Sequence, residues 1–106
     1  MSELVNKLSQ KDHPVRISIR PEATPKALKE CIDRGYVHVK FTETRGGTEL
    51  GLALEMQESN FSEADFSAGQ GSISLVGRLT LDYVPVKCLA TIDLSSMAGR
   101  GYLVPA

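Results

Sequence analysis

A single β-hairpin over residues 36–57 constrains the fold of this chain more than any other feature. Residues 36–44 and 48–57 both alternate apolar and polar side chains, which is typical of strands with one buried face. Gly46 and Gly47 lie between the two runs and can adopt the positive φ angles that a two-residue turn needs. The pattern therefore predicts two antiparallel strands joined by a tight turn.

The turn and the hydrophobic alternation predict the same register, because a slip of one residue would expose every apolar side chain. In this register Phe41 faces Leu52 on the buried side, and His38 faces Glu55 on the other side. A carboxylate that holds a histidine is an arrangement used by general bases. It is equally an ordinary exposed cross-strand pair, and the sequence leaves both interpretations open.

The outer face of this hairpin carries the residues that we predict to take part in binding. The predicted ligand-binding set consists of the His–carboxylate pair and its two flanking polar residues: His38, Glu55, Tyr36 and Lys40. Gly51 and Ala53 lie on the same face, with Thr42 opposite, and small side chains in mid-strand leave a shallow trough. This interaction surface either faces open solvent or is covered by the N-terminal helix, a second copy of the chain or a flat ligand.

One helix is predicted over residues 25–34. Thr24 can cap it, and Pro25 occupies the first helical position, where its missing N–H costs no hydrogen bond. Gly35 suits the left-handed residue that ends many helices. A short N-terminal helix and further strands over residues 15–20, 72–83, 86–94 and 102–104 complete the expected elements, and residues 58–71 form the longest irregular segment.

These elements predict an α+β fold with residues 1–106 as a single domain. We expect a curled, mostly antiparallel sheet of about five to six strands. The main helix, about 25–34, is expected to pack on one face of the sheet, and the fold also contains the short N-terminal helix. For the strands at 72–83 and 86–94 the charge pair Asp82–Lys87 predicts a longer turn around Val84 and Pro85.

Charge is balanced overall but not along the chain. The formal net charge is −1, which does not favour nucleic acid as a partner. Residues 1–48 carry nine bases and six acids, a balance of +3, whereas residues 49–106 carry three bases and seven acids, a balance of −4. Two solvated faces of one domain explain this split, and so does self-association through opposite patches. We expect a homodimer, with a protein or small-molecule partner left open.

Neither a signal peptide nor a membrane-spanning run is apparent in the sequence. Cys31 and Cys88 have no His or Cys at metal-ligand spacing, so we predict two free thiols, no metal and no cofactor. A disulfide between them would require a suitable approach, which the sequence does not decide. These features predict a cytoplasmic protein without membrane contact.

Two fragments resemble parts of the PilZ cyclic-di-GMP domain. Residues 16–20 place Arg16 and Arg20 at that family's two-arginine spacing, and residues 93–95 resemble the start of its D-x-S-x-x-G motif. Gly99 comes one residue later than that motif requires, and the two fragments are 73 positions apart along the chain. We therefore do not carry the family's ligand or site residues over to this chain.

The function that these observations favour is a non-enzymatic binding or protein-interaction module that self-associates. Enzymatic activity stays uncertain, because His13 and His38 are the only histidines and no nucleophile motif accompanies them. The alternative is a small-molecule-binding protein or minimal enzyme with a pocket between the sheet, the helix and the 58–71 loop. A nucleic-acid contact is the last of the functions that we consider. It would use four basic side chains, Arg16, Arg20, Lys40 and Arg45.

Overall fold

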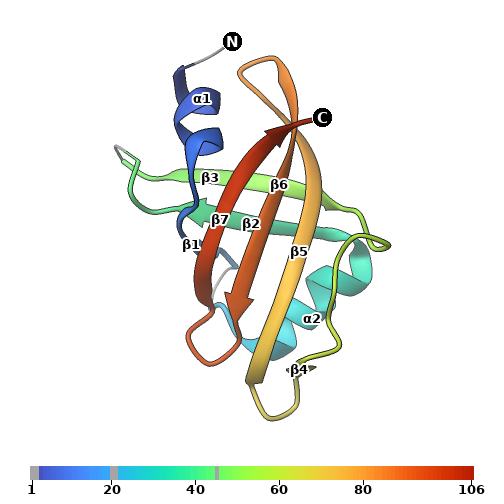
Figure 1. Ribbon diagram of the computed structural model, residues 1–106. Helices are drawn as coiled ribbons and strands as arrows, with labels where there is room; N and C mark the ends of the chain where they lie inside the picture. The colour runs from blue at the N-terminus through green and yellow to red at the C-terminus, as the bar shows by residue number, and fades with distance from the viewer. Residues whose placement is uncertain (1–2, 20–21, 45) are drawn as a thin grey trace.

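The computed structural model describes residues 3–19, 22–44 and 46–106. Its elements follow the chain in the order α1 (Glu3–Gln10), β1 (His13–Ile17), α2 (Pro25–Arg34), β2 (Tyr36–Phe41), β3 (Thr48–Leu54), β4 (Ala64–Asp65), β5 (Gln70–Leu81), β6 (Val84–Asp93) and β7 (Ala98–Pro105). All strand pairs are antiparallel. Figure 1 shows the long, bent strands β5, β6 and β7 crossing β2 and β3.

Six strands close into an antiparallel barrel. The neighbours run β3-β2-β1-β7-β6-β5, and a further pairing of β3 with β5 completes the ring, while β4 pairs only with the outer edge of β5. The predicted curled sheet with one main helix on one face is therefore wrong. Closure removes the sheet edges that an open sheet would have to protect, and it puts the core inside the ring.

Two short helices complete the barrel. Figure 1 shows α1 towards the top of the view and α2 towards the bottom. Each inserts two apolar side chains that are at least 96% buried: Val5 and Leu8 from α1, and Leu28 and Ile32 from α2. Burial of such a side chain contributes about 1.5–3 kcal/mol. The helices therefore add to the core from two places instead of covering one sheet face.

The predicted caps of α2 are confirmed. The Thr24 hydroxyl accepts a hydrogen bond from the Ala27 amide at 3.1 Å, and Pro25 stands at the start of the helix. Gly35 ends it at φ 79° and donates its amide to the Ile32 carbonyl. These contacts satisfy helix-end groups locally, which explains why the sequence predicts this element so well.

The hairpin of β2 and β3 keeps its predicted buried face as far as Leu52, but its predicted register and its predicted two-residue turn are wrong, and Met56 is exposed. Phe41 faces Thr48, so every residue of β2 meets a partner four positions earlier than expected. Residues 42–47 form the connection, and Arg45 within it lies outside the described residues. The shift is an even number of residues, so Val37, Val39 and Phe41 still point inward, each fully buried.

The hairpin of β5 and β6 differs from expectation in the same way. Leu81 pairs with Val84, and Asp82 and Tyr83 alone form the turn, with φ values of 49° and 66°. The predicted pair of Asp82 with Lys87 and the longer turn around Pro85 are therefore wrong. Two residues with positive φ match the twist of a tight hairpin, and the register follows from that turn.

Buried apolar side chains from both helices and all six barrel strands make one core. The largest fully buried members are Phe41, Leu8, Ile17, Leu28, Leu52, Ile73, Leu75, Ile92, Leu94 and Leu103. No helix within the described part of the chain is long and apolar enough to span a bilayer.

Candidate functional site

The outer face of β1, β2 and β3 positions the predicted ligand-binding residues. Tyr36, His38 and Lys40 alternate along β2 and are exposed, as predicted. His38 lies opposite Gly51 and not Glu55, so the predicted cross-strand pair does not form. Glu55 instead follows β3 and accepts a hydrogen bond from Arg78 Nε at 2.9 Å. The structure therefore separates the two groups that a His–carboxylate dyad would need together.

The trough predicted over Gly51 and Ala53 is occupied in part by Tyr36. The Tyr36 and His38 rings meet edge-on, with centroids 5.1 Å apart. A Cβ added to Gly51 would collide with the Tyr36 hydroxyl and lie 3.2 Å from His38 Nε2. Glycine at this position thus makes room for a side chain of the neighbouring strand. Thr42 lies away from the trough, where its amide donates to the Pro14 carbonyl at 3.3 Å.

A continuous groove runs between the end of β1, residues 18–19 and 22–24, and α2. Three adjoining cavities of about 380, 280 and 470 Å³ make it up. Ile19 lines all three, Ser18 and Glu22 each line two, and Cys31 and Arg34 join the second to the third. The groove is thus one open feature of about the size of ligand sites in proteins.

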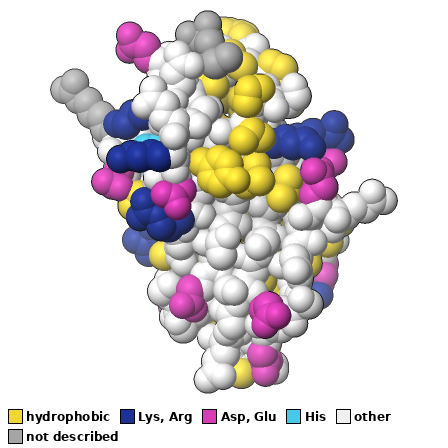
Figure 2. Space-filling view, viewed as in Figure 1, with side chains coloured by type: hydrophobic (Ala, Val, Ile, Leu, Met, Phe, Trp, Pro, Cys, Tyr) yellow, Lys and Arg dark blue, Asp and Glu magenta, His cyan; other side chains and the backbone are white. Residues whose placement is uncertain are grey.

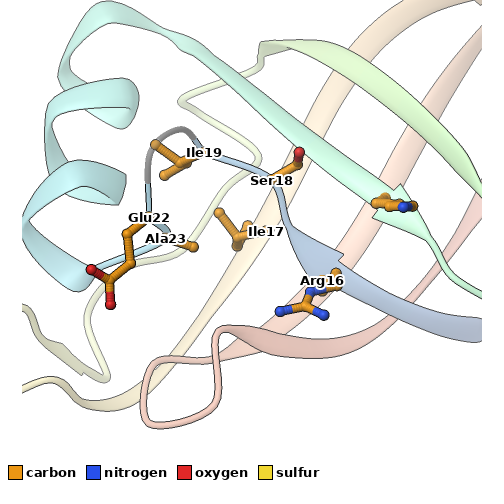
Figure 3. A pocket seen from close by; sticks show the side chains of 7 residues that line it. Arg16, Ile17, Ser18, Ile19, Glu22 and Ala23 are labelled. Atoms are coloured by element: carbon orange, nitrogen blue, oxygen red, sulfur yellow. The ribbon is translucent and has the colours of Figure 1, made fainter.

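The first cavity has charged ends and an apolar middle. Figure 3 shows Arg16 and Glu22 on opposite sides of it, with Ile17 and Ala23 between them. Lys40 also lines this cavity, because β1 and β2 pair Arg16 directly with Lys40. Arg20, the second arginine of the 16–20 fragment, lies outside the described residues.

The second cavity is polar, and two side-chain contacts order its wall. The Ser18 hydroxyl donates to the Glu49 carboxylate, and the Ser18 amide donates to the His38 carbonyl at 3.0 Å. Arg34 Nη2 donates to Cys31 Sγ at 3.4 Å. Donors, acceptors and a cation therefore converge on a small volume from β1, β2, β3 and α2, as in sites that orient a ligand.

The two cysteines differ sharply in their surroundings. Both are free thiols, as predicted, and Cys31 is only half-buried in the groove. Cys88 is fully buried in β6, and burial raises the pKa of its thiol to about 12. A thiol reacts through its thiolate, so Cys88 is inert in the folded protein and Cys31 is the accessible one.

The fold places residues 16–17, from the first PilZ-like fragment, beside residues 97–98, which follow the second fragment. The Ile17 amide donates to the Met97 carbonyl at 2.9 Å, and Arg16 faces Ala98. The Asp93 carboxylate is engaged within its own loop, where it accepts from the Ser95 hydroxyl at 2.8 Å and the Ser95 amide at 2.9 Å. The Ser95 hydroxyl, and after it the Ser95 amide, lowers the pKa of the Asp93 carboxyl.

Sequence reasoning missed most of the groove. Ser18, Ile19, Glu22 and Arg34 were not among the predicted binding residues, although His38 and Lys40 both line the groove. The alternation of apolar and polar residues over 15–20 could have identified two of the groove residues, since it places Arg16 and Ser18 on the outer face beside β2. The contribution of α2 depends on where the helix packs, which local patterns do not determine.

No family model matches this chain, and comparison with curated proteins also finds no match. Within residues 3–19, 22–44 and 46–106, no group of three or more His, Cys, Asp or Glu side chains is arranged to hold a metal ion.

Proposed function

We propose that this chain is a non-enzymatic binding module that holds a small molecule in the groove between β1, residues 18–19 and 22–24, and α2. The continuity of the three cavities carries this proposal, because Ile19 lines each of them. A ligand there would meet apolar surface at Ile19 and Ala23 and polar groups at Ser18 and Arg34. This combination of apolar area and a few convergent polar groups is common in ligand sites.

The site differs in position from the pocket that the sequence predicted. None of these three cavities is lined by the 58–71 segment, whose Gly69 lies against Pro25 at the start of α2. The proposed site therefore uses the sheet and the helix that the sequence predicted, but residues 18–19 and 22–24 line it in place of the 58–71 loop. Self-association and a cytoplasmic location belong to the same proposal, and a free, half-buried Cys31 fits a reducing compartment.

Cys31 offers a direct test, since a bulky maleimide adduct on it would fill the groove. The protein without the adduct is first labelled with isotopes for NMR. We expect its amide spectra to identify ligands from a library of nucleotides, sugars, organic acids and amines. The shifts should gather at Ser18, Ile19 and Arg34. The adduct should abolish those shifts, because the ligand and the adduct compete for one volume.

The matched control carries the same adduct elsewhere on α2. Lys29 does not line these cavities and pairs with Asp33 on the exposed side of the helix at 2.7 Å. In a Cys31→Ser, Lys29→Cys chain the adduct should leave binding intact. Ligand shifts that survive the Cys31 adduct, or that gather on another face of the barrel, would refute the proposed site.

A further inference from the structure

A second hollow, separate from the groove, lies on the outer face of β5, β6 and β7. Its volume is about 210 Å³, and it shares no lining residue with the three cavities of the groove. Figure 2 shows apolar side chains gathered at the centre of this face. The hollow is smaller than the roughly 300–1,000 Å³ of most ligand pockets, so it has room for a single small ring.

One wall of the hollow is apolar. Val76 faces Leu89, and Leu89 faces Tyr102, so the three outward side chains form a row across the strands. Val76 is nearly covered, Leu89 is half-buried and Tyr102 is 37% exposed. Leu89 and Tyr102 therefore supply the apolar surface of this wall, and the Tyr102 ring can also pair with an aromatic ligand.

The base of the hollow carries two short side chains with hydroxyl groups. In the adjoining row of the sheet Ser74 faces Thr91, and Thr91 faces Arg100. Ser74 and Thr91 are exposed, and within the described part of the chain neither hydroxyl makes a hydrogen bond. Each hydroxyl can both donate and accept. A ligand that reaches this base would thus meet hydrogen-bonding groups that the protein itself does not use.

Arg100 closes another side of the hollow and is held in place by Asp12. Arg100 Nη2 donates to the Asp12 carbonyl and to its carboxylate, both at 3.2 Å. Among the described residues that line the hollow, these two alone are charged, and they form an ion pair. Because their charges cancel, the hollow favours a neutral ligand over an ion.

The spacing of Arg100 and Tyr102 suits a flat ring. The two residues are two positions apart on β7, and both point outward on either side of the buried Gly101. Such neighbours are about 6.6–6.8 Å apart along a strand. A planar ring between them would contact each side chain at about 3.5 Å, which is the optimal separation of carbon atoms. A guanidinium stacks on aromatic faces, whereas a puckered, saturated ring is thicker and fits this spacing less well.

We propose that this hollow binds a small neutral aromatic molecule that carries a hydroxyl or ring N–H group, as phenols and indoles do. The ring would lie between Tyr102 and Arg100, beside Leu89. Its polar group would form hydrogen bonds with the hydroxyls of Ser74 and Thr91. This inference goes beyond the proposed function, because the site lies outside the groove and takes a different class of ligand.

The test compares one probe with two analogues. The probe is para-cresol; its methyl ether lacks the donor group, and cyclohexanol lacks the flat ring. Each compound is titrated into isotope-labelled protein, and the amide shifts of Thr91, Arg100 and Tyr102 are followed. We expect para-cresol to bind about two- to tenfold more tightly than either analogue, because one neutral hydrogen bond or one aromatic contact contributes about that much.

Two double variants test the hydroxyl groups. S74A/T91V removes both hydroxyls from the hollow, and S72A/T80V makes the same kind of change at two positions of β5 that do not line it. In S74A/T91V the preference for para-cresol over its methyl ether should disappear, because neither ligand can then bond to the base of the hollow. In S72A/T80V the preference should remain.

Two single variants test the aromatic contact. Tyr102→Val should weaken the binding of para-cresol by about two- to tenfold, because the ring loses its aromatic partner. Tyr36→Val removes another exposed tyrosine from the outer face of the barrel, away from the hollow, and should leave the affinity unchanged. Circular dichroism checks that every variant is folded.

Three outcomes would overturn the inference. These are the lack of any shift with para-cresol at millimolar concentration, equal affinity for cyclohexanol, and a loss of preference in S72A/T80V as large as that in S74A/T91V. Modification of Cys31 should leave the binding of para-cresol unchanged, and shifts that gather at Ser18 and Arg34 would place it in the groove instead. Because para-cresol lies outside the ligand classes of the groove test, either site can be refuted while the other stands.

Discussion

At the scale of single residues, backbone conformation decides more than side-chain chemistry in this protein. Asp82 and Tyr83 both have positive φ, and the Tyr83 side chain is 98% exposed. A residue with a Cβ is disfavoured in the left-handed region by about 1–2 kcal/mol, because the Cβ approaches the following carbonyl oxygen. The turn of β5 and β6 therefore holds strain that an exposed side chain does not offset through packing.

Replacement of Tyr83 by glycine should remove this strain. We expect Tyr83→Gly to stabilise the protein by about 1 kcal/mol, because glycine adopts positive φ without a steric penalty. For a chain of this length that corresponds to a rise of about 4–8 °C in melting temperature, measurable by differential scanning calorimetry. Tyr83→Ala is the control, since alanine keeps the Cβ and should give no such gain. An equal gain in both variants would place the strain in the side chain and not in the backbone.

At the scale of elements, the contact between β3 and β5 closes the barrel. This seam contains only two residue pairs, Ala53 with Arg78 and Leu54 with Gly77. The strands approach closely there, because a Cβ on Gly77 would lie 2.6 Å from Leu52 Cβ. Gly77 is buried and has no positive φ, so the lack of a side chain, and not a special backbone angle, makes glycine necessary.

Gly77→Ala should loosen this seam. We expect a loss of about 1–3 kcal/mol in the free energy of unfolding, as for other insertions of a methyl group into a packed interior. Urea unfolding followed by circular dichroism measures it. Thr80→Ala, at an exposed position of the same strand, should change stability by about 0.5 kcal/mol or less. A Gly77→Ala variant as stable as the wild type would mean that Leu52 can move aside at little cost.

At the scale of the whole molecule, the two halves of the sequence, which carry opposite net charge, supply different strands of the barrel. The first half of the chain supplies β1 and β2, and the second half supplies β5, β6 and β7. Figure 2 shows basic and acidic side chains intermixed in the upper half of one face and mainly acidic ones at its lower end. Opposite charge on different parts of the surface favours head-to-tail contact between copies, which is our proposal for self-association.

If these charges hold two copies of the chain together, self-association should weaken as the salt concentration rises. We expect light scattering at low ionic strength to give twice the monomer mass of 11.5 kDa. Because surface attractions are screened within about 3 Å in 1 M salt, the mass should fall to that of the monomer there. A monomer at all salt concentrations and at high protein concentration would contradict self-association, and a dimer unaffected by salt would point to an apolar interface.

The sequence by itself determined the type of most elements and which of their faces are buried. Thr24, Pro25 and Gly35 fixed α2 because caps act within one turn of the chain. Alternation of apolar and polar residues predicted which face of each hairpin points inward. Both predicted registers were wrong by four residues, but side-chain direction repeats every two residues, so the predicted inward faces of the paired strands stayed correct.

Only the tertiary structure decided the registers, the closure of the barrel and the composition of the groove. Register depended on which residues form the turns, and closure depended on pairings between β3 and β5 and between β1 and β7. The groove joins Arg16, Lys40 and Arg34 from three elements. Such neighbours are set by packing between distant segments, which local patterns do not encode, and so the predicted partner of His38 was wrong while its outward direction was right.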